Sequence, residues 1–464
     1  MRQNKTEMRI GMKNMTLKNI AAACGGRLFG GMEDLEIVGA VMDSRQIEKD
    51  YLFFAIKGER VDGHRFIPQV MEKGAACAVC EEAPEKPAGP YILVEDVKKA
   101  MQDIAAFYRG GLSIPVIGIT GSVGKTSTKE FIASVLGEKM NVLKTCGNYN
   151  NELGVPLTLF RIREEHEAAV VEMGINHFGE MHRLSRMAAP DIVVMTNIGD
   201  CHLEALGSRA GILKAKSEIF DYLQENGTVI VNGDDDLLRT IDKVHKKAPV
   251  TFGKNKNNMC YATDIQKHGL FGTTATIHML SGNFTVKIPL PGEHMVYNAL
   301  AAAAVGEALG LSMEEIAAGI AAVKPTEGRS NLIKCDDKVI LDDCYNANPV
   351  SMCAALDLLA QADTRKVAIL GDMFELGENA EDLHGDVGRY AAKLCVDVIV
   401  CVGGLSGNMA REAKAVSSKS EVHYYSKKEN LLQELERLVK PGDTVLVKAS
   451  HGMGFAEIVE NLKQ

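Results

Sequence analysis

The sequence predicts an α/β protein of three domains. Short apolar runs rich in β-branched residues alternate with stretches whose apolar residues recur at helical spacing, which is typical of parallel sheets covered by helices. A glycine-rich turn joins one such run to a helical stretch at residues 116–136. The length of 464 residues fits about three domains of ordinary size.

The first domain is expected to span residues 1–111. A loop rich in proline and glutamate lies inside it at 81–90, and the stretch "RGGLSIP" at 109–115 indicates a linker out of it. The pair "CAVC" at 77–80 has no further zinc ligands nearby at a suitable spacing, which favours a structural role. All 11 cysteines are scattered, mostly within apolar runs, so we expect reduced thiols.

The second domain is expected at 112–326 and the third at 327–464. In the second domain, strands are expected at 168–174, 191–199 and 227–235, with a helix at 208–223. Short antiparallel strands at 274–280 and 284–290 and an Ala-rich helix at 291–310 are expected to follow. In the third, helices separate strands at 338–344, 366–372, 397–404 and 443–450. The third domain has no phosphate-binding loop of its own.

The composition excludes several classes of protein. A net charge of −9 argues against general nucleic-acid binding. The N-terminal residues lack the apolar core of a signal peptide, and no apolar run is long enough to span a bilayer. We therefore expect a cytoplasmic protein that is not inserted in a membrane, and we expect a monomer.

The stretch "VIGITGSVGKTSTKE" at 116–130 predicts a phosphate-binding loop between a strand and a helix. Ile119 stands where the usual pattern has its first glycine. Glycines let backbone N–H groups approach phosphates, and a helix N-terminus favours their charge. Lys125 can reach the β- and γ-phosphates of ATP, and Thr126 can ligate magnesium. The predicted ATP-binding residues of the loop are Gly121, Ser122, Val123, Gly124, Lys125, Thr126 and Ser127.

Polar residues at strand ends are further candidates. Glu172 ends an apolar run, where it is either a magnesium ligand or a surface glutamate; the polar turn after it favours the ligand. Asn150 and Asn151 lie in a stretch that is either a plain loop or a site for phosphate and peptide groups of a substrate. His202 follows a strand on the expected nucleotide face, which favours contact with a metal or phosphate.

Two other regions carry candidates. On composition alone Lys216 is an ordinary solvated lysine of a helix. In the third domain, a polar turn lies between a strand and a helix that Pro349 starts. Its side chains are expected to project from the strand end, where they can face a ligand: Asp343, Tyr345, Asn346 and Asn348.

These motifs together resemble the Mur ligases. The loop "ITGSVGKT", with an apolar residue in place of the first glycine, is similar to theirs, so Ile119 does not count against ATP binding. The other matching stretches run through all three domains in the expected order: 42–67, 147–159, 172–181, 201–208, 215–220, 342–352 and 370–384. Among sister ligases, "DDCYNANP" is similar to the member that adds D-alanyl-D-alanine.

The resemblance implies a fold and a reaction. It implies a central ATPase domain with a parallel sheet, an N-terminal uridine-nucleotide domain and a Rossmann-like C-terminal domain. It implies that ATP activates the carboxylate of UDP-N-acetylmuramoyl-tripeptide as an acyl phosphate. The amine of D-alanyl-D-alanine then attacks it, in the synthesis of peptidoglycan precursors.

The resemblance also implies roles for residues. Lys125, His202 and Lys216 take part in catalysis. Two magnesium ions are expected at Thr126, Glu172, His202 and Lys216, with Lys216 carbamylated. The nucleotide is expected to contact Asn298, Arg329, Asp343 and Asn346, and the uridine diphosphate Ser44 and Arg45. The chain departs from the family at Asp50, where glycine is frequent, and at His451, where arginine is common.

Other functions stay open on the sequence. A sister ligase that adds one amino acid, or a folylpolyglutamate-type ligase, shares the loop and mechanism. An ATP-driven switch or motor would hydrolyse ATP without an acceptor, and a non-catalytic scaffold would bind nucleotide without turnover. The third residue of the tripeptide, diaminopimelate or lysine, is also open.

Overall fold

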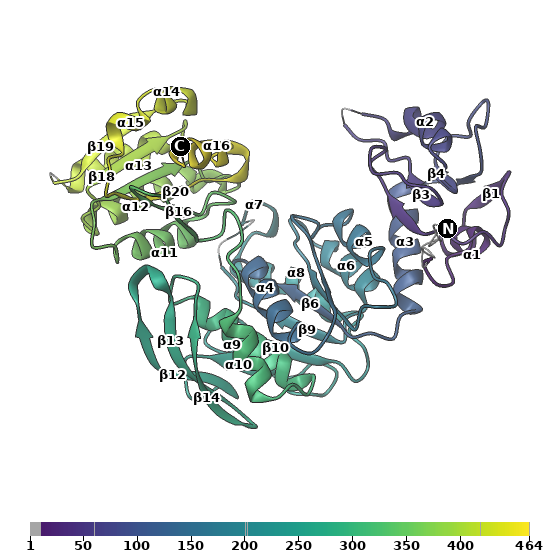
Figure 1. Ribbon diagram of the computed structural model, residues 1–464, viewed down its shortest axis with the longest axis horizontal. Coiled ribbons are helices and arrows are strands. Elements are labelled where there is room, and N and C mark those ends of the chain that lie inside the picture. Colours follow the sequence, from purple (N-terminus) through teal and green to yellow (C-terminus); the bar gives the residue numbers. More distant parts are fainter. Residues whose placement is uncertain (1–10, 60, 200, 202, 418, 464) are drawn as a thin grey trace, which may run out of the picture. The chain divides into compact units, whose positions relative to one another are not determined.

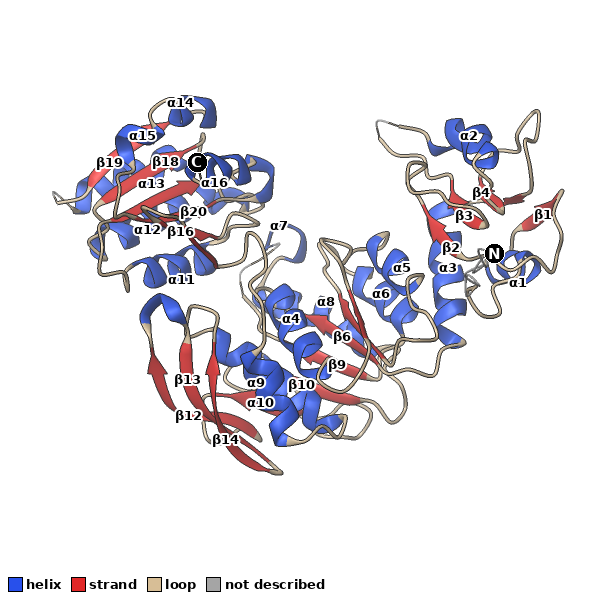
Figure 2. Cartoon of the chain, in the orientation of Figure 1, coloured by secondary structure: helices blue, strands red, loops and turns tan. Residues whose placement is uncertain are grey.

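The computed structural model describes residues 11–59, 61–199, 201, 203–417 and 419–463, and its α/β class is the one predicted (Figures 1 and 2). The chain divides into two compact units. The first unit comprises the residues up to Thr120, Met140–Val194 and Lys216–Thr228; the second comprises Gly121–Lys139, Met195–Ala215 and the chain from Val229 onward. Among the described residues, no helix is long and apolar enough to cross a membrane.

The N-terminal part of the first unit is a five-stranded sheet in the order β1-β5-β4-β3-β2. Its strands are β1 (Arg27–Phe29), β2 (Gly39–Val41), β3 (Tyr51–Phe54), β4 (Cys77–Cys80) and β5 (Tyr91–Leu93), and its helices are α1 (Leu17–Ala23), α2 (Ile67–Glu72) and α3 (Val97–Gly110). β1 pairs antiparallel to β5 and the other pairs are parallel. The "CAVC" pair is strand β4 itself, with all four residues buried.

Helix α3 is fastened to the part of the first unit that follows it. The Tyr108 hydroxyl donates to the Ile162 carbonyl at 2.6 Å. Arg109 is 6% exposed and donates to the Ala188 carbonyl at 2.8 Å and to the Asp191 carboxylate at 2.7 Å. The predicted linker at 109–115 is therefore wrong at its first two residues, which form the end of α3, and the first of them, Arg109, is buried.

The central sheet has nine strands in the order β14-β13-β12-β11-β10-β9-β6-β8-β7. Its bounds are β6 (Val116–Thr120), β7 (Val142–Lys144), β8 (Ala168–Glu172), β9 (Ile192–Met195), β10 (Thr228–Asn232), β11 (Val250–Gly253), β12 (Cys260–Lys267), β13 (Thr273–Met279) and β14 (Gly282–Ile288). β6, β8 and β7 pair in parallel, as do β10, β11 and β12. β12, β13 and β14 pair antiparallel, which confirms the predicted antiparallel addition.

The helices of this region are α4 (Lys125–Leu136), α5 (Gly154–Leu159), α6 (Glu180–Ala188), α7 (Leu203–Leu206), α8 (Arg209–Ser217), α9 (Met295–Ala308) and α10 (Met313–Ala321). The predicted Ala-rich helix is α9, and its alanines before the last residue are buried: Ala299, Ala301, Ala302, Ala303 and Ala304. Helix α10 lies very close to α4, because a Cβ on Gly319 would come within 2.4 Å of the Val135 Cα. Small residues therefore set how closely these helices pack.

The C-terminal sheet has six strands in the order β15-β16-β20-β17-β18-β19. They are β15 (Asn331–Lys334), β16 (Val339–Asp342), β17 (Lys366–Gly371), β18 (Val398–Val402), β19 (Glu421–Tyr425) and β20 (Thr444–Lys448). β15 pairs antiparallel with β16, and every other pair is parallel. This is the Rossmann-like arrangement that was predicted.

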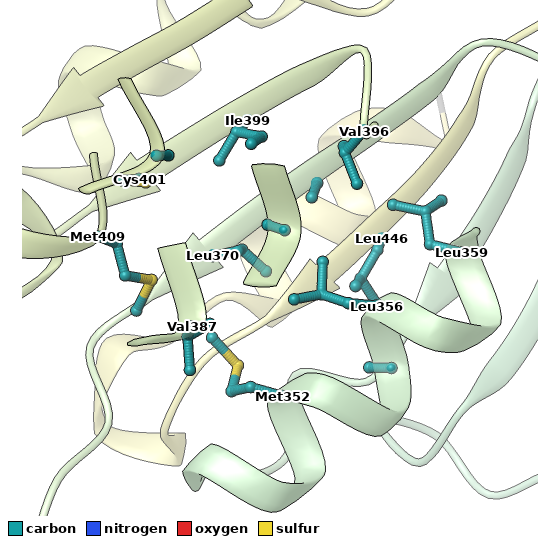
Figure 3. Close-up of a cluster of buried hydrophobic side chains, with 14 of the residues drawn as sticks. Met352, Leu356, Leu359, Leu370, Val387, Val396, Ile399, Cys401, Met409 and Leu446 are labelled. Carbon is teal, nitrogen blue, oxygen red and sulfur yellow. The ribbon is translucent and has the colours of Figure 1, made fainter. Parts of the chain in front are cut away.

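Helices cover both faces of the C-terminal sheet. α11 (Pro349–Leu359), α12 (Ala380–Lys393) and α13 (Ser406–Val416) share one apolar cluster with the sheet, in which Met352, Leu370 and Val387 meet (Figure 3). α14 (Lys428–Leu432), α15 (Leu435–Leu438) and α16 (Ala456–Leu462) share a separate cluster with the opposite face. Alternate residues of each strand enter the two clusters, as expected for a sheet buried on both sides.

Candidate active site

The phosphate loop lies between β6 and α4, as predicted, and two residues after β9 hold its shape. The Val123 N–H donates to the Asn197 side chain at 2.9 Å, and the Val123 carbonyl accepts from the Thr196 hydroxyl at 2.7 Å. Gly121 has φ +151°, and a Cβ there would lie 1.9 Å from the Thr196 hydroxyl oxygen. The sequence analysis did not single out Thr196 and Asn197, although their place at a strand end was a usable signal.

The loop contains the groups that are predicted to bind phosphate. Lys125 begins helix α4, and its ammonium donates to the Gly121 carbonyl at 2.8 Å across the loop. Gly124 caps the helix with φ +85°, a conformation that suits glycine. Thr126 lies in the first turn and is 9% exposed. The first-turn N–H groups and the positive end of the helix dipole therefore form an anion site.

Asn298, predicted near the nucleotide, ties α9 to α4. Its carbonyl oxygen accepts from the Thr128 hydroxyl at 2.9 Å, and its amide donates to the Met295 sulfur at 3.2 Å. The side chain is 6% exposed. These bonds show how Asn298 supports the loop helix, and its contact with a nucleotide stays a prediction.

In the first unit, Glu172 ends β8 and is 2% exposed, so the alternative of a surface glutamate is wrong. Its carboxylate accepts from the Asn150 side chain at 2.9 Å. The Asn150 carbonyl also accepts from the Gly174 N–H at 2.8 Å, which fixes the turn after β8. Asn150 thus orients the carboxylate that is the candidate metal ligand.

Asn151 has a different local role from Asn150. Its side chain accepts from the Leu153 and Gly154 N–H groups, at 3.2 and 2.9 Å, and so caps the start of α5. The contacts of Asn150 and Asn151 with a substrate stay a prediction.

Lys216, an ordinary solvated lysine on composition alone, is 1% exposed at the end of α8. Two residues later, the Glu218 carboxylate accepts from the Gly179 and His182 N–H groups, at 3.0 and 3.2 Å. It thereby caps helix α6, which follows the turn after Glu172. His202, the other predicted metal ligand, lies outside the described residues.

The candidate residues for uridine diphosphate lie in the N-terminal part of the first unit. Arg45 is exposed and makes a two-pronged ion pair with Asp43, at 2.9 and 2.7 Å. The hydrogen bond from the Arg45 side chain holds the pKa of the Asp43 carboxyl below its ordinary value. The Ser44 carbonyl accepts from the Lys73 ammonium at 3.1 Å, which adds a second cation that the sequence analysis missed.

The C-terminal candidates gather at the ends of β16 and β20. The Asp343 carboxylate accepts from the Ser330 N–H at 2.9 Å and from the Lys448 ammonium at 2.5 Å. The Arg329 guanidinium lies 3.9 Å from the centre of the Tyr345 ring. The Asn346 carbonyl also accepts from Lys448, at 3.0 Å. Lys448 was not predicted, because nothing local marks a lysine at a strand end as buried.

Asn348 has a structural explanation. It caps helix α11 in a reciprocal pair of hydrogen bonds with Ser351, and Pro349 is the first helical residue, as predicted.

The candidates of the first unit are Ser44, Arg45, Asn150, Asn151, Glu172 and Lys216. Those of the second are the phosphate loop, Asn298, Arg329, Asp343 and Asn346.

The sheets, the loop and the polar strand ends are those of an α/β protein with a phosphate-binding type of loop. Family models agree: the Mur ligase family catalytic domain matches residues 36–109, the Mur ligase middle domain 119–306, and the Mur ligase glutamate ligase domain 328–451. The chain belongs to the Mur ligase family.

Individual relatives sharpen this picture. The UDP-N-acetylmuramoyl-tripeptide–D-alanyl-D-alanine ligase of Bacillus subtilis is 39% identical, over 97% of this chain and 99% of the relative. The ligase of the same name from Escherichia coli is 36% identical, over 98% and 99%. The crystal structure of MurF from Acinetobacter baumannii is 34% identical with a TM-score of 0.88, over 97% of this chain and 98% of that one.

Two further solved structures, one of a MurF ligase and one of a folylpolyglutamate synthase, differ in how similar they are to this chain. MurF ligase from Thermotoga maritima in complex with ADP is 29% identical with a TM-score of 0.80, over 92% of this chain and 97% of that one. A folylpolyglutamate synthase from Mycobacterium tuberculosis is 16% identical with a TM-score of 0.62, over 78% and 94%. The second likeness is one of fold alone.

Proposed function

We propose that this chain uses ATP to join D-alanyl-D-alanine to UDP-N-acetylmuramoyl-tripeptide in the synthesis of peptidoglycan precursors. The observation that carries the proposal is the identity of 36–39%, over nearly the whole chain, with two ligases of that name. We place the reaction in the cytoplasm, where ATP is available, and expect a monomer.

The chemistry follows from the low reactivity of a carboxylate. The terminal carboxylate of the tripeptide attacks the γ-phosphorus of ATP, and the bond to the bridging oxygen of ADP breaks. The dipeptide amine attacks the resulting acyl phosphate, and the tetrahedral intermediate releases phosphate and a proton. Alignment of such reactants alone can contribute roughly 7–11 kcal/mol.

The phosphate loop supplies binding and charge neutralisation for this reaction. The N–H groups of the first turn of α4 and the Lys125 ammonium face the phosphates, where negative charge moves during transfer. Asn298 and Asn346 lie around the adenine, Asp343 meets the ribose, and Arg329 reaches the nucleotide. Ser44 and Arg45 hold the uridine diphosphate.

The donor set fits magnesium. The ion prefers oxygen ligands and usually takes one or two protein carboxylates besides substrate phosphates and water. Glu172, buried and oriented by Asn150, offers such a carboxylate, and Thr126 offers a hydroxyl. Within the described part of the chain, no three His, Cys, Asp or Glu side chains gather as a metal cluster. Thr126, Glu172, His202 and Lys216 would hold two magnesium ions, which neutralise phosphate charge when bound.

Lys216 fits this role as a carbamate. A cationic ammonium beside metal ions would be repelled by them. Addition of carbon dioxide to the neutral amine forms a C–N bond and releases a proton. The product is an anion whose oxygens suit magnesium.

One assay separates the candidate functions. Phosphate release is measured with the UDP-linked tripeptide, in its diaminopimelate and lysine forms, with and without D-alanyl-D-alanine. We expect release to require both the tripeptide and the dipeptide. Rapid hydrolysis without the dipeptide would favour a motor, binding without turnover would favour a scaffold, and turnover with a single amino acid would favour a sister ligase.

A further inference from the structure

The C-terminal sheet has a topological switch point between β16 and β20. These two strands are parallel neighbours, with Asp342 opposite Val447. After β16 the chain enters α11, which packs on one face of the sheet, and after β20 it enters α16, which packs on the other. The loops that leave the two strands therefore diverge. Ligands of doubly wound sheets bind in the crevice that such divergence opens at the carboxyl ends of the strands.

A buried lysine lies at this switch point. Lys448 is the last residue of β20, and its side chain is 2% exposed. Its ammonium donates to the Asp343 carboxylate at 2.5 Å and to the Asn346 carbonyl at 3.0 Å. The other Asp343 oxygen accepts from the Ser330 N–H. Lys448 thus holds two residues of the loop after β16 by hydrogen bonds: Asp343, which begins the loop, and Asn346.

We propose that Lys448 is a positioning residue for the nucleotide, acting through Asp343 and Asn346. The inference rests on the proposed function, which makes these two residues nucleotide contacts. A loop already held in its binding conformation loses less conformational freedom when the ligand arrives. A buried ammonium is costly, and an apolar side chain often serves stability equally well. Because stability alone does not require a lysine here, the place of Lys448 at the switch point favours a role in binding the nucleotide.

A second ion pair lies at the opposite end of β20, where β20 begins beside β17. The Arg365 guanidinium, just before β17, donates to the Asp443 carboxylate at 2.7 Å, just before β20. Asp443 is 2% exposed and Arg365 is 29% exposed, so this pair is buried on its acidic side and partly open on its basic side. Amino ends of the strands form no switch-point crevice. Loss of this pair therefore shows how much the removal of a merely structural ion pair changes nucleotide binding.

The test uses the full chain and a non-hydrolysable ATP analogue. Its dissociation constant is measured by calorimetry for wild type, Lys448→Met, Arg365→Met, Asp343→Asn and the double variant Lys448→Met/Asp343→Asn. We expect Lys448→Met to weaken binding roughly tenfold, since it removes a charged hydrogen bond. Arg365→Met should change binding less than about twofold. In the Asp343→Asn background, the Lys448 substitution should add less than about threefold, because the two residues act together.

Steady-state kinetics give a second readout. Lys448→Met should raise the KM for ATP and leave the KM for the UDP-linked tripeptide unchanged, which a general loss of folded protein would not do. If the methionine variant does not fold, Lys448→Gln tests the charge on its own, because it keeps a donor for the Asn346 backbone carbonyl and loses the charge beside Asp343; unchanged analogue binding in this variant overturns the inference.

Each contrary result is distinct. Unchanged analogue binding in a folded Lys448 variant overturns the inference, and so does equal weakening by Arg365→Met. If Asp343→Asn binds the analogue as wild type does, the inference that Lys448 acts through Asp343 is overturned. The ligase proposal is judged separately, by whether phosphate release in the wild type depends on the dipeptide.

Discussion

At the scale of a single residue, burial decides what Lys216 can be. Its side chain is 1% exposed, whereas Lys214 on the same helix is exposed. A buried ammonium near metal ions is unfavourable, while a carbamate is a good magnesium ligand. The two lysines of α8 therefore provide a matched pair for testing the modification.

We expect Lys216→Ala to lose at least about 99% of ligase activity, because a metal ligand is lost. Short carboxylic acids such as formate or acetate should restore part of it, since their oxygens replace those of the carbamate. Lys214→Ala should remain close to wild type in the same phosphate-release assay. An alanine variant at 216 that keeps most of its activity would rule out the carbamate.

At the scale of an element, α3 is bound at its end. Arg109 donates to the Leu112, Ala188 and Ala189 carbonyls and to Asp191. Burial lowers the pKa of its guanidinium, and the Asp191 carboxylate opposes that shift. The contact joins α3 to the segment between α6 and β9, so this part of the first unit should depend on one side chain.

We expect Arg109→Met to lower the free energy of unfolding by about 3 kcal/mol, because it removes the cation paired with Asp191 and leaves several carbonyls without this donor. Arg411→Met on α13 is the control, since its side chain is 68% exposed and its loss should cost little. Urea unfolding monitored by circular dichroism measures both. Equal, small effects of the two substitutions would show that the end of α3 is not held by Arg109.

Elements with local signals were predicted well. The strand, glycine turn and helix of the phosphate loop, and the start of α11 at Pro349, are encoded within a few residues. Arg109 was placed in a linker because two glycines follow it, and its partners lie about 80 positions away in the chain. Lys448 and Thr196 were missed for the same reason, since each acts through residues distant in sequence.

At the scale of the whole molecule, ligand binding should be readable from stability, because a ligand that binds the native state stabilises it. The expected gain is about 2.7 kcal/mol at a ligand concentration one hundred times Kd. The candidate residues for the two substrates belong to different units: Lys125 to the second, and Ser44 and Arg45 to the first. A chain of this size need not unfold in a single two-state transition. The effect of each ligand is therefore measured on one unfolding transition, with and without that ligand.

We expect the ATP analogue and the UDP-linked tripeptide each to raise the unfolding temperature of the wild-type protein. Lys125→Ala should lose the shift with the analogue and keep the shift with the tripeptide, because a loop lysine contacts phosphate and its loss leaves the core intact. Arg45→Ala should show the reverse pattern. Differential scanning calorimetry measures all four combinations of variant and ligand.

If Lys125→Ala keeps the full shift with the analogue and also keeps turnover, the loop is not the ATP site. If Arg45→Ala keeps the full shift with the tripeptide, the uridine diphosphate binds elsewhere.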